Sequence, residues 1–189
     1  MSKPALIVVD VQRDFCEGGA LAAADTLSLL EPLRRFVEQA RSKGAVIVYT
    51  RDWHPANHSS FQAQGGPWPV HGVADTKGAE IMPPLRTEAG DVIVSKGVAV
   101  QGAGYSGFEA TGLAEKLRSL NVERVAVTGI AAEYCVRATA LDSLRTQFET
   151  TVLTDLIRAV NPSDTPKVLA ELKQAKAQIR TSAEWLASL

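Results

Sequence analysis

The chain has 189 residues, a formal net charge of −1 and 46% hydrophobic residues. A chain of this size and composition is typical of one folded domain rather than of a disordered or fibrous protein, so we expect residues 1–189 to form a single domain. The balance of 20 Lys and Arg residues against 21 Asp and Glu residues argues against binding to nucleic acid or to an anionic membrane surface.

Neither an export signal nor a membrane span is expected. The apolar run near the N-terminus, residues 5–9, is too short for a signal peptide, and no apolar run is long enough to cross a bilayer. The two cysteines, Cys16 and Cys135, could form at most one disulfide. We therefore expect a reduced, cytoplasmic setting.

Apolar strands alternate with amphipathic helices along the chain. The expected strands are residues 5–9, 45–50, 91–95, 122–128, 150–153 and 178–181. The expected helices are residues 26–43, 108–120, 135–148, 164–177 and 183–188. Pro32 suits a first helical turn, so the first helix should become regular near Leu30, and Ser163 should cap the fourth. This alternation predicts an α/β fold in three layers, with a central, mainly parallel sheet between two helical layers.

Two long loops interrupt this pattern. Residues 51–84 show no period and contain five of the nine prolines, and residues 97–107 are rich in glycine. A loop as long as residues 51–84 inside a compact domain is usually functional or disordered. Its tryptophans and histidines favour a function.

Four reactive side chains are expected at one edge of the sheet. Asp10, Asp52, Lys96 and Cys135 each lie at or just beyond the carboxyl end of an expected strand, where parallel sheets bind their ligands. Taken singly, such an aspartate is more often a turn residue and such a lysine is usually solvated. Together, Asp10, Lys96 and Cys135 would supply a base, a cation and a nucleophile.

Cys135 is expected where a helix begins. A thiol there faces unpaired backbone N–H groups and the positive end of the helix dipole, which both favour the thiolate. The same N–H groups could hold a developing oxyanion. The alternative is a buried cysteine that packs as a small apolar residue.

All three histidines of the chain, His54, His58 and His71, fall in the loop 51–84. His54 and His71, together with Asp52, form a ligand set that suits Zn²⁺, Fe²⁺ or Mn²⁺ and leaves positions open for water or substrate. The alternative is a loop whose histidines only cap turns. His58 could be a further ligand, but it fits a turn or an outer layer of the site equally well.

Three aromatic residues, Phe15, Trp68 and Tyr105, come from separate loops at the same edge and could sandwich a flat ring. Taken singly, each would be ordinary packing. Cys16 follows Phe15 with no base nearby in the sequence, so we interpret it as structural.

Six segments together resemble the signature segments of nicotinamidases (pyrazinamidases), which belong to the isochorismatase-like cysteine hydrolases. They are VVDVQRDFCEGGAL, RDWHPANHSSF, WPVH, SKG, YSGFE and GIAAEYCVRATALD, and the match spans residues 5–162. The resemblance implies the isochorismatase-like hydrolase fold. It also implies roles for particular residues: Asp10, Lys96 and Cys135 as the catalytic triad; Asp52, His54 and His71 as the ligands of one divalent metal ion, Zn²⁺ first; and Phe15, Trp68 and Tyr105 as the ring-binding aromatics.

The resemblance further implies an oxyanion hole made by the N–H groups of Ala131 and Cys135, and a cis peptide between Ile130 and Ala131. The implied reaction converts nicotinamide, and also pyrazinamide, into the carboxylate and ammonia through a cysteine thioester, which would feed NAD salvage. The partner is then a small molecule, with both monomers and homo-oligomers among such proteins. Gly72 and Glu133 depart from the residues that many members have, cysteine and aspartate, and neither change is expected to abolish the chemistry. His58 follows His54 by four positions, and the resemblance implies that a histidine at this spacing does not bind the metal, so we leave it out of the ligand set.

Three alternatives remain at this stage. Another amide or ureido hydrolase of the same superfamily, such as a carbamoyl-amine hydrolase or isochorismatase, would generally lack the metal ligands. A non-catalytic metal- or ligand-binding module would release no ammonia from any amide. A redox protein would use Cys16 and Cys135, which lack C-x-x-C spacing.

Overall fold

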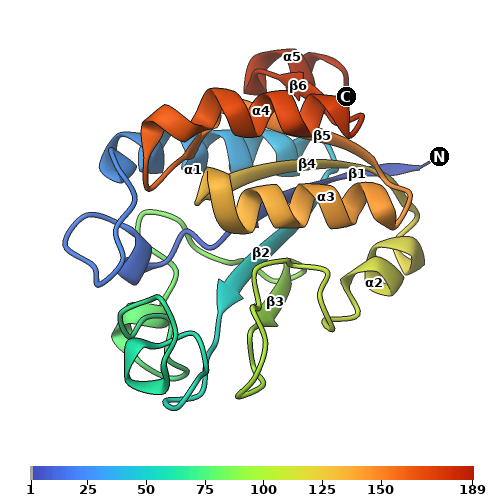
Figure 1. Cartoon of the computed structure of the whole chain (residues 1–189). Coiled ribbons are helices and arrows are strands. Elements are labelled where there is room, and N and C mark those ends of the chain that lie inside the picture. The colour runs from blue at the N-terminus through green and yellow to red at the C-terminus, as the bar shows by residue number, and fades with distance from the viewer. Residues whose placement is uncertain (1) are drawn as a thin grey trace.

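The computed structural model describes residues 2–189 and contains one six-stranded sheet (Figure 1). The strands are all parallel and lie in the order β3-β2-β1-β4-β5-β6. Their bounds are β1 Lys3–Val9, β2 Val46–Asp52, β3 Val92–Lys96, β4 Val122–Ile130, β5 Glu149–Arg158 and β6 Gln178–Arg180. The predicted α/β fold with a central parallel sheet is confirmed.

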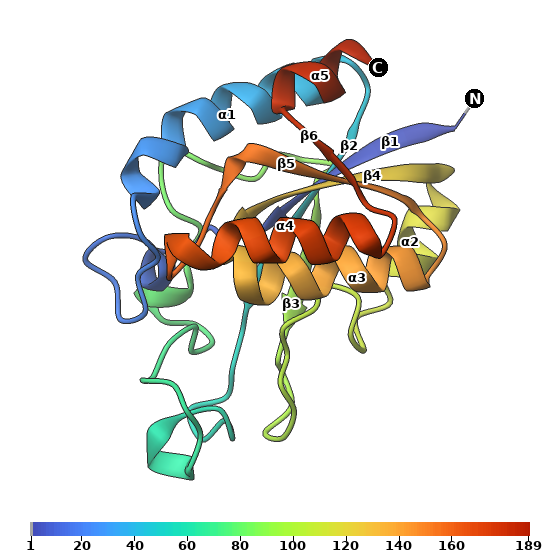
Figure 2. The same cartoon turned by 45° about the horizontal axis from the view of Figure 1, so that its top comes forward.

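Helices cover both faces of this sheet. They are α1 Thr26–Ser42, α2 Leu113–Ser119, α3 Arg137–Arg145, α4 Thr165–Gln174 and α5 Ser182–Ala187. Figure 2 shows α1 and α5 on one side of the sheet and α3 and α4 on the other, which gives the expected three layers. Among residues 2–189, no helix is both long and apolar enough to cross a membrane.

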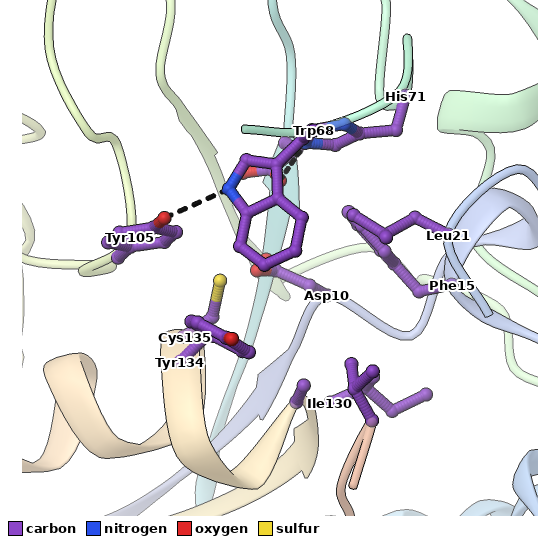
Figure 3. Close-up of a pocket in the computed structure, with 12 residues that line it drawn as sticks. Asp10, Phe15, Leu21, Trp68, His71, Tyr105, Ile130, Tyr134 and Cys135 are labelled. Atoms are coloured by element: carbon purple, nitrogen blue, oxygen red, sulfur yellow. Dashed lines mark hydrogen bonds and ion pairs between the residues drawn. The ribbon is translucent and has the colours of Figure 1, made fainter. Parts of the chain in front are cut away.

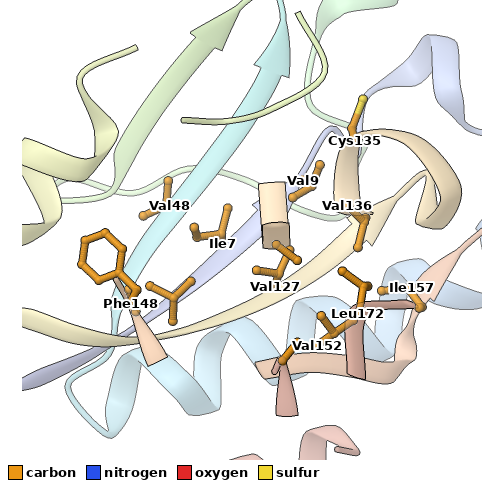
Figure 4. Close-up of a cluster of buried hydrophobic side chains, with 14 of the residues drawn as sticks. Ile7, Val9, Val48, Val127, Cys135, Val136, Phe148, Val152, Ile157 and Leu172 are labelled. Carbon is orange, nitrogen blue, oxygen red and sulfur yellow. The ribbon is translucent and has the colours of Figure 1, made fainter. Parts of the chain in front are cut away.

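The strands are buried on both faces because each face packs against a helical layer. In β1, Ile7 and Val9 belong to the core under α2, α3 and α4, whereas Leu6 and Val8 belong to the core under α1 and α5. Figure 4 shows the first of these cores, where strand side chains meet Leu172 of α4. The uninterrupted apolar run of this strand is typical of a doubly covered parallel sheet.

The first helix begins at Thr26, as expected, but it is regular from there rather than from near Leu30. Pro32 therefore lies inside the helix and not in its first turn. Proline has no N–H, so the carbonyl of Ser28 loses its helical partner, but Ser28 and Pro32 are both exposed and water can reach that carbonyl. Burial of the Leu29 side chain against the sheet favours the earlier start.

The predicted start of α2, the predicted cap of α4 and the predicted end of β5 were also wrong. α2 begins at Leu113 instead of residue 108, because Gly112 before it has a left-handed backbone with φ of 71°. Ser163 does not cap α4, since it lies in a 3₁₀ turn, Pro162–Asp164, that the Asn161 side chain caps.

β5 continues to Arg158 rather than ending near residue 153, with a register shift opposite Gly129. The longer β5 brings the chain after it to the carboxyl ends of the strands, where the reactive residues lie.

Candidate active site

The carboxyl edge of the sheet brings together the four reactive residues expected there. Asp10 directly follows β1, and Asp52 and Lys96 are the last residues of β2 and β3, where they are register partners. Cys135 lies in one π-helical turn, Ala132–Val136, between β4 and α3. All four side chains are buried.

Lys96 is the centre of this cluster. Its Nζ lies 2.8 Å from Asp10 Oδ2 and 2.5 Å from Asp52 Oδ1, and it donates a hydrogen bond of 2.9 Å to the carbonyl of Gly104. Burial opposes the charge of this ammonium group, but Asp10 and Asp52 outweigh burial, so the pKa of Lys96 is raised well above its ordinary value. The lysine is therefore a permanent cation between two carboxylates.

Cys135 faces this cluster, with its Sγ 3.4 Å from Lys96 Nζ. Burial raises the pKa of the thiol well above its usual range, Lys96 works against that rise, and Asp10 and Asp52 add to it. Burial and the two carboxylates therefore act against the thiolate that the helix start was expected to favour. The resting group is a thiol that needs a base.

Asp10 is placed to be that base. One carboxylate oxygen of Asp10 lies within 4.8 Å of the Cys135 sulfur, and the Thr50 hydroxyl donates a hydrogen bond of 2.6 Å to Oδ1. Burial raises the pKa of Asp10 above its ordinary value even though Lys96 acts in the opposite direction. A carboxylate with a raised pKa is a stronger proton acceptor than an exposed aspartate.

The Asp52 carboxylate also faces two histidines. His54 Nε2 lies 3.3 Å and His71 Nε2 lies 3.8 Å from Asp52 Oδ2, and one ligand atom from each of the three residues lies within 4.8 Å of the others. His54 Nδ1 and His71 Nδ1 lie 2.8 Å and 2.7 Å from the carbonyls of Gly97 and Pro69. Because a carbonyl can only accept, each Nδ1 carries a proton and each Nε2 can offer a lone pair.

This arrangement fits a divalent cation. Three electron-pair donors converge in a buried space, and the second nitrogen of each imidazole is held by a backbone carbonyl, as in protein metal sites. Burial lowers the pKa of His54, but Asp52 outweighs it, so that the pKa is raised overall. Burial lowers the pKa of His71, so that imidazole favours its neutral form, which is the form that can bind a metal ion.

His58 lies next to this cluster but outside it. Its ring stacks on that of His54 with centroids 4.0 Å apart, and its Nδ1 is 2.7 Å from Ser60 Oγ and accepts the Ser60 N–H. Its Nε2 has no hydrogen-bond partner among residues 2–189. His58 is therefore not one of the three residues whose ligand atoms converge.

A pocket with an empty volume of about 410 Å³ opens over Cys135. The three aromatic residues singled out in the sequence all line it, together with Asp10, Asp52 and His71. Trp68 Nε1 donates a hydrogen bond of 3.0 Å to the Tyr105 hydroxyl, and Figure 3 shows Phe15 across the pocket from Tyr105. The pocket thus combines a thiol, charged groups and flat aromatic surfaces.

Four further residues line the pocket that were not among the expected site residues: Leu21, Ile130, Tyr134 and Val160. Tyr134 packs edge-on against Trp68, with the two ring centroids 5.0 Å apart. Val160 was hidden because β5 was expected to end too early. The position of Tyr134 directly before Cys135 was the one available signal.

The turn before Cys135 has the cis peptide bond that the resemblance implied. The peptide bond between Ile130 and Ala131 is cis, and Ala131 and Cys135 both line the pocket.

Comparison with known proteins places these features in a family. The isochorismatase domain model matches residues 4–184. The chain is 34% identical to a nicotinamidase of Escherichia coli strain K12, over 98% of both chains. It is also similar to the structure of a pyrazinamidase of Pyrococcus horikoshii in complex with zinc, with a TM-score of 0.91, 45% identity, and coverage of 95% of this chain and 99% of that one. A structure of PnC1 from L. infantum in complex with nicotinate gives a TM-score of 0.88 at 35% identity, covering 96% and 94%.

Proposed function

Since this chain belongs to the isochorismatase family, we propose that it is a metal-dependent amidase that hydrolyses nicotinamide to nicotinate and ammonia. The observation that carries this proposal is the position of the Cys135 thiol, which faces Asp10 and Lys96 in a pocket shared with aromatic walls and the metal-binding cluster. The nicotinamidase and pyrazinamidase relatives support the choice of substrate, and pyrazinamide would be a second one.

The substrate ring would lie between Phe15 and Trp68, with the carboxamide beside Cys135. Tyr105 would fix the plane of Trp68 through its hydrogen bond. Asp52, His54 and His71 would hold the divalent metal ion, which would supply a Lewis acid for the pyridine nitrogen and for water. Zn²⁺ is our first choice, with Fe²⁺ and Mn²⁺ as alternatives.

In the first half of the reaction, Asp10 takes the thiol proton and becomes neutral, and the Lys96 ammonium group stabilises the resulting thiolate of Cys135. The sulfur of Cys135 then attacks the carbonyl carbon, and the N–H groups of Ala131 and Cys135 donate to the oxyanion. As the C–N bond breaks, Asp10 returns the proton to the leaving nitrogen. Ammonia departs and a thioester remains on Cys135.

In the second half, Asp10 accepts a proton from a water molecule that attacks the thioester carbon. The C–S bond breaks, the sulfur takes the proton back from Asp10, and nicotinic acid leaves and loses its carboxyl proton to solvent as nicotinate. We place this reaction in nicotinamide salvage toward NAD in a reduced cytoplasm, and the unpaired state of Cys16 and Cys135 supports a reduced setting.

Ammonia release from nicotinamide by the purified protein tests the nucleophile. Cys135→Ala should lower kcat by more than about 1,000-fold, because removal of a catalytic nucleophile abolishes the covalent route. Cys16→Ala is the matched control and should retain turnover, since Cys16 is buried away from the pocket. Near-normal turnover by Cys135→Ala would reject the mechanism.

Metal removal tests the second part of the proposal. Dialysis against a chelator, with the metal content measured afterwards, should abolish ammonia release, and addition of Zn²⁺, Mn²⁺ or Fe²⁺ should restore it. Full activity of protein shown to be free of metal would leave a cysteine hydrolase without a catalytic metal. No release by the metal-loaded protein would reject nicotinamide and favour the alternative, another amide or ureido substrate.

A further inference from the structure

Gln12 is a fully buried residue that none of the steps above uses. Its Oε1 accepts a hydrogen bond of 2.8 Å from the N–H of Asp52, and its Nε2 donates one of 2.9 Å to the carbonyl of the same residue. The other Nε2 hydrogen is donated to the carbonyl of Ala79, also at 2.9 Å. The oxygen and the nitrogen of the Gln12 side-chain amide therefore both form hydrogen bonds with the backbone of Asp52.

This contact occurs where the sheet stops supporting Asp52. The pairing of β1 with β2 ends at Val8 opposite Tyr49, and the N–H of Asp10 makes the last backbone bond, to the carbonyl of Thr50. Beyond that point Asp52 has a strand partner only on the β3 side. The side-chain amide of Gln12 takes the place of the missing β1 backbone on the other side.

The position of Asp52 matters because its carboxylate is divided between two tasks. One oxygen contacts the Lys96 ammonium group at 2.5 Å, and the other faces the Nε2 atoms of His54 and His71. A small shift of the Asp52 backbone would move both oxygens together. The bond from Gln12 to Ala79 also ties the long loop after β2 to this point.

We propose that Gln12 is a positioning residue for the metal site: its side-chain amide fixes the backbone of Asp52 so that the carboxylate reaches Lys96 and the cation at the same time. This inference rests on the metal site of the proposed function. Gln12 makes no hydrogen bond to His54, His71 or Lys96, so its effect on the cation passes through Asp52. Outer-layer partners of this kind typically change metal affinity by about 10- to 100-fold.

The test compares Zn²⁺ binding by Gln12→Met with that of the unaltered protein. Methionine keeps the length of the side chain and removes all three hydrogen bonds. We expect the Kd for Zn²⁺, measured by competition with a chromogenic chelator, to rise about 10- to 100-fold, and the visible spectrum of the Co²⁺-loaded protein to change. Gln12→Asn, which keeps an amide but is too short for both contacts, is a second variant with the same expected direction.

Thr150→Val is the matched structural control. Thr150 is also buried and bonds to Ser143 Oγ at 2.8 Å and to the Phe148 carbonyl at 3.0 Å, but it lies at the opposite edge of the sheet, at the start of β5. This variant should lower the melting temperature without changing the Kd for Zn²⁺ or the Co²⁺ spectrum. The same result for Gln12→Met would overturn the proposal and leave Gln12 with a purely structural role.

Asp52→Ala separates this inference from the proposed function. If the unaltered protein binds Zn²⁺ tightly and Asp52→Ala does not, the metal site stands and the Gln12 variants test positioning alone. If Asp52→Ala binds Zn²⁺ as tightly as the unaltered protein, the proposed metal site is wrong and the role of Gln12 is overturned with it.

Discussion

The two cysteines of the chain are both buried but have different surroundings. Cys135 lines the pocket, where Asp10 can accept its proton and Lys96 can stabilise the product. Cys16 is 0% exposed and packs in the core under α1, and burial raises its pKa to about 11 although the Thr26 hydroxyl lowers it. Only one of the thiols therefore has both access and a base.

We expect iodoacetamide at pH 8 to alkylate the folded protein once, at Cys135, with loss of activity. Cys16 is 0% exposed and does not line the pocket, whereas Cys135 lines the pocket beside Asp10, which can accept its proton. Peptide mass spectrometry after a time course gives the site, and unfolding in guanidinium should expose the second thiol. Labelling of Cys16 at a rate comparable to Cys135 would contradict this assignment.

Tyr134 forms the wall of the pocket beside the nucleophile. It packs edge-on against Trp68 and lies 5.9 Å from the ring of Tyr105. Tyr134→Leu should raise the KM for nicotinamide about 2- to 10-fold, as expected from the loss of one aromatic pair, with a smaller change in kcat. Steady-state kinetics measures the split, and Tyr49→Phe, which loses a hydroxyl contact to the Arg86 carbonyl outside the pocket, is the control. A fall in kcat at unchanged KM would show that Tyr134 acts on the chemistry instead.

At the scale of single residues, the sequence predicts which site residues lie close together, but it does not predict their protonation states. Asp10, Asp52 and Lys96 could be brought together because each ends an apolar strand, and parallel strands end at one edge. The pKa of Cys135 could not be predicted, because it depends on desolvation and on carboxylates from other strands. The hydrogen bonds between the Gln12 side chain and the Asp52 backbone could not be predicted either, because they join two residues that lie 40 positions apart in the sequence.

At the scale of elements, strands were easier to predict than their ends. An apolar run defines the buried part of a strand, but its end depends on the neighbouring strands and loops. β5 shows this, since its second half pairs with β4 only after a register shift and then carries Val160 to the pocket. α2 shows the reverse, because the backbone at Gly112 delays a helix that the apolar residues alone would begin earlier.

Pro32 in α1 provides a test of how tertiary packing overrides local preference. The residue is exposed, so its replacement disturbs no core contact. Pro32→Ala should restore the N–H to the carbonyl of Ser28 and stabilise the protein by about 1–3 kcal/mol, after allowance for the greater freedom of the unfolded chain. Urea unfolding followed by circular dichroism measures the change. A lower midpoint in the variant would mean that the proline stabilises the helix where it is.

At the scale of the whole molecule, one sheet joins two hydrophobic cores. β1 and β4 lie at its centre, and each contributes alternate side chains to the core on either face. A disturbance of either core therefore reaches the other through these strands. This continuity supports the prediction of a single domain, for which thermal unfolding should show one transition rather than two resolved ones.

Zn²⁺ should shift that transition as a whole. A ligand that binds only the folded state at 100 times its Kd adds about 2.7 kcal/mol to the free energy of unfolding, which for a chain of this size corresponds to about 5–10 °C in Tm. Because Asp52, His54 and His71 come from β2 and the long loop after it, the cation would link that loop to the sheet and leave no separate loop transition.

Differential scanning calorimetry of metal-free and Zn²⁺-loaded protein measures this shift, with Asp52→Ala and His71→Ala as variants that should lose it. An equal shift in those variants would place the bound ion elsewhere, since the Asp52 carboxylate and the His71 imidazole are two of the three converging donors.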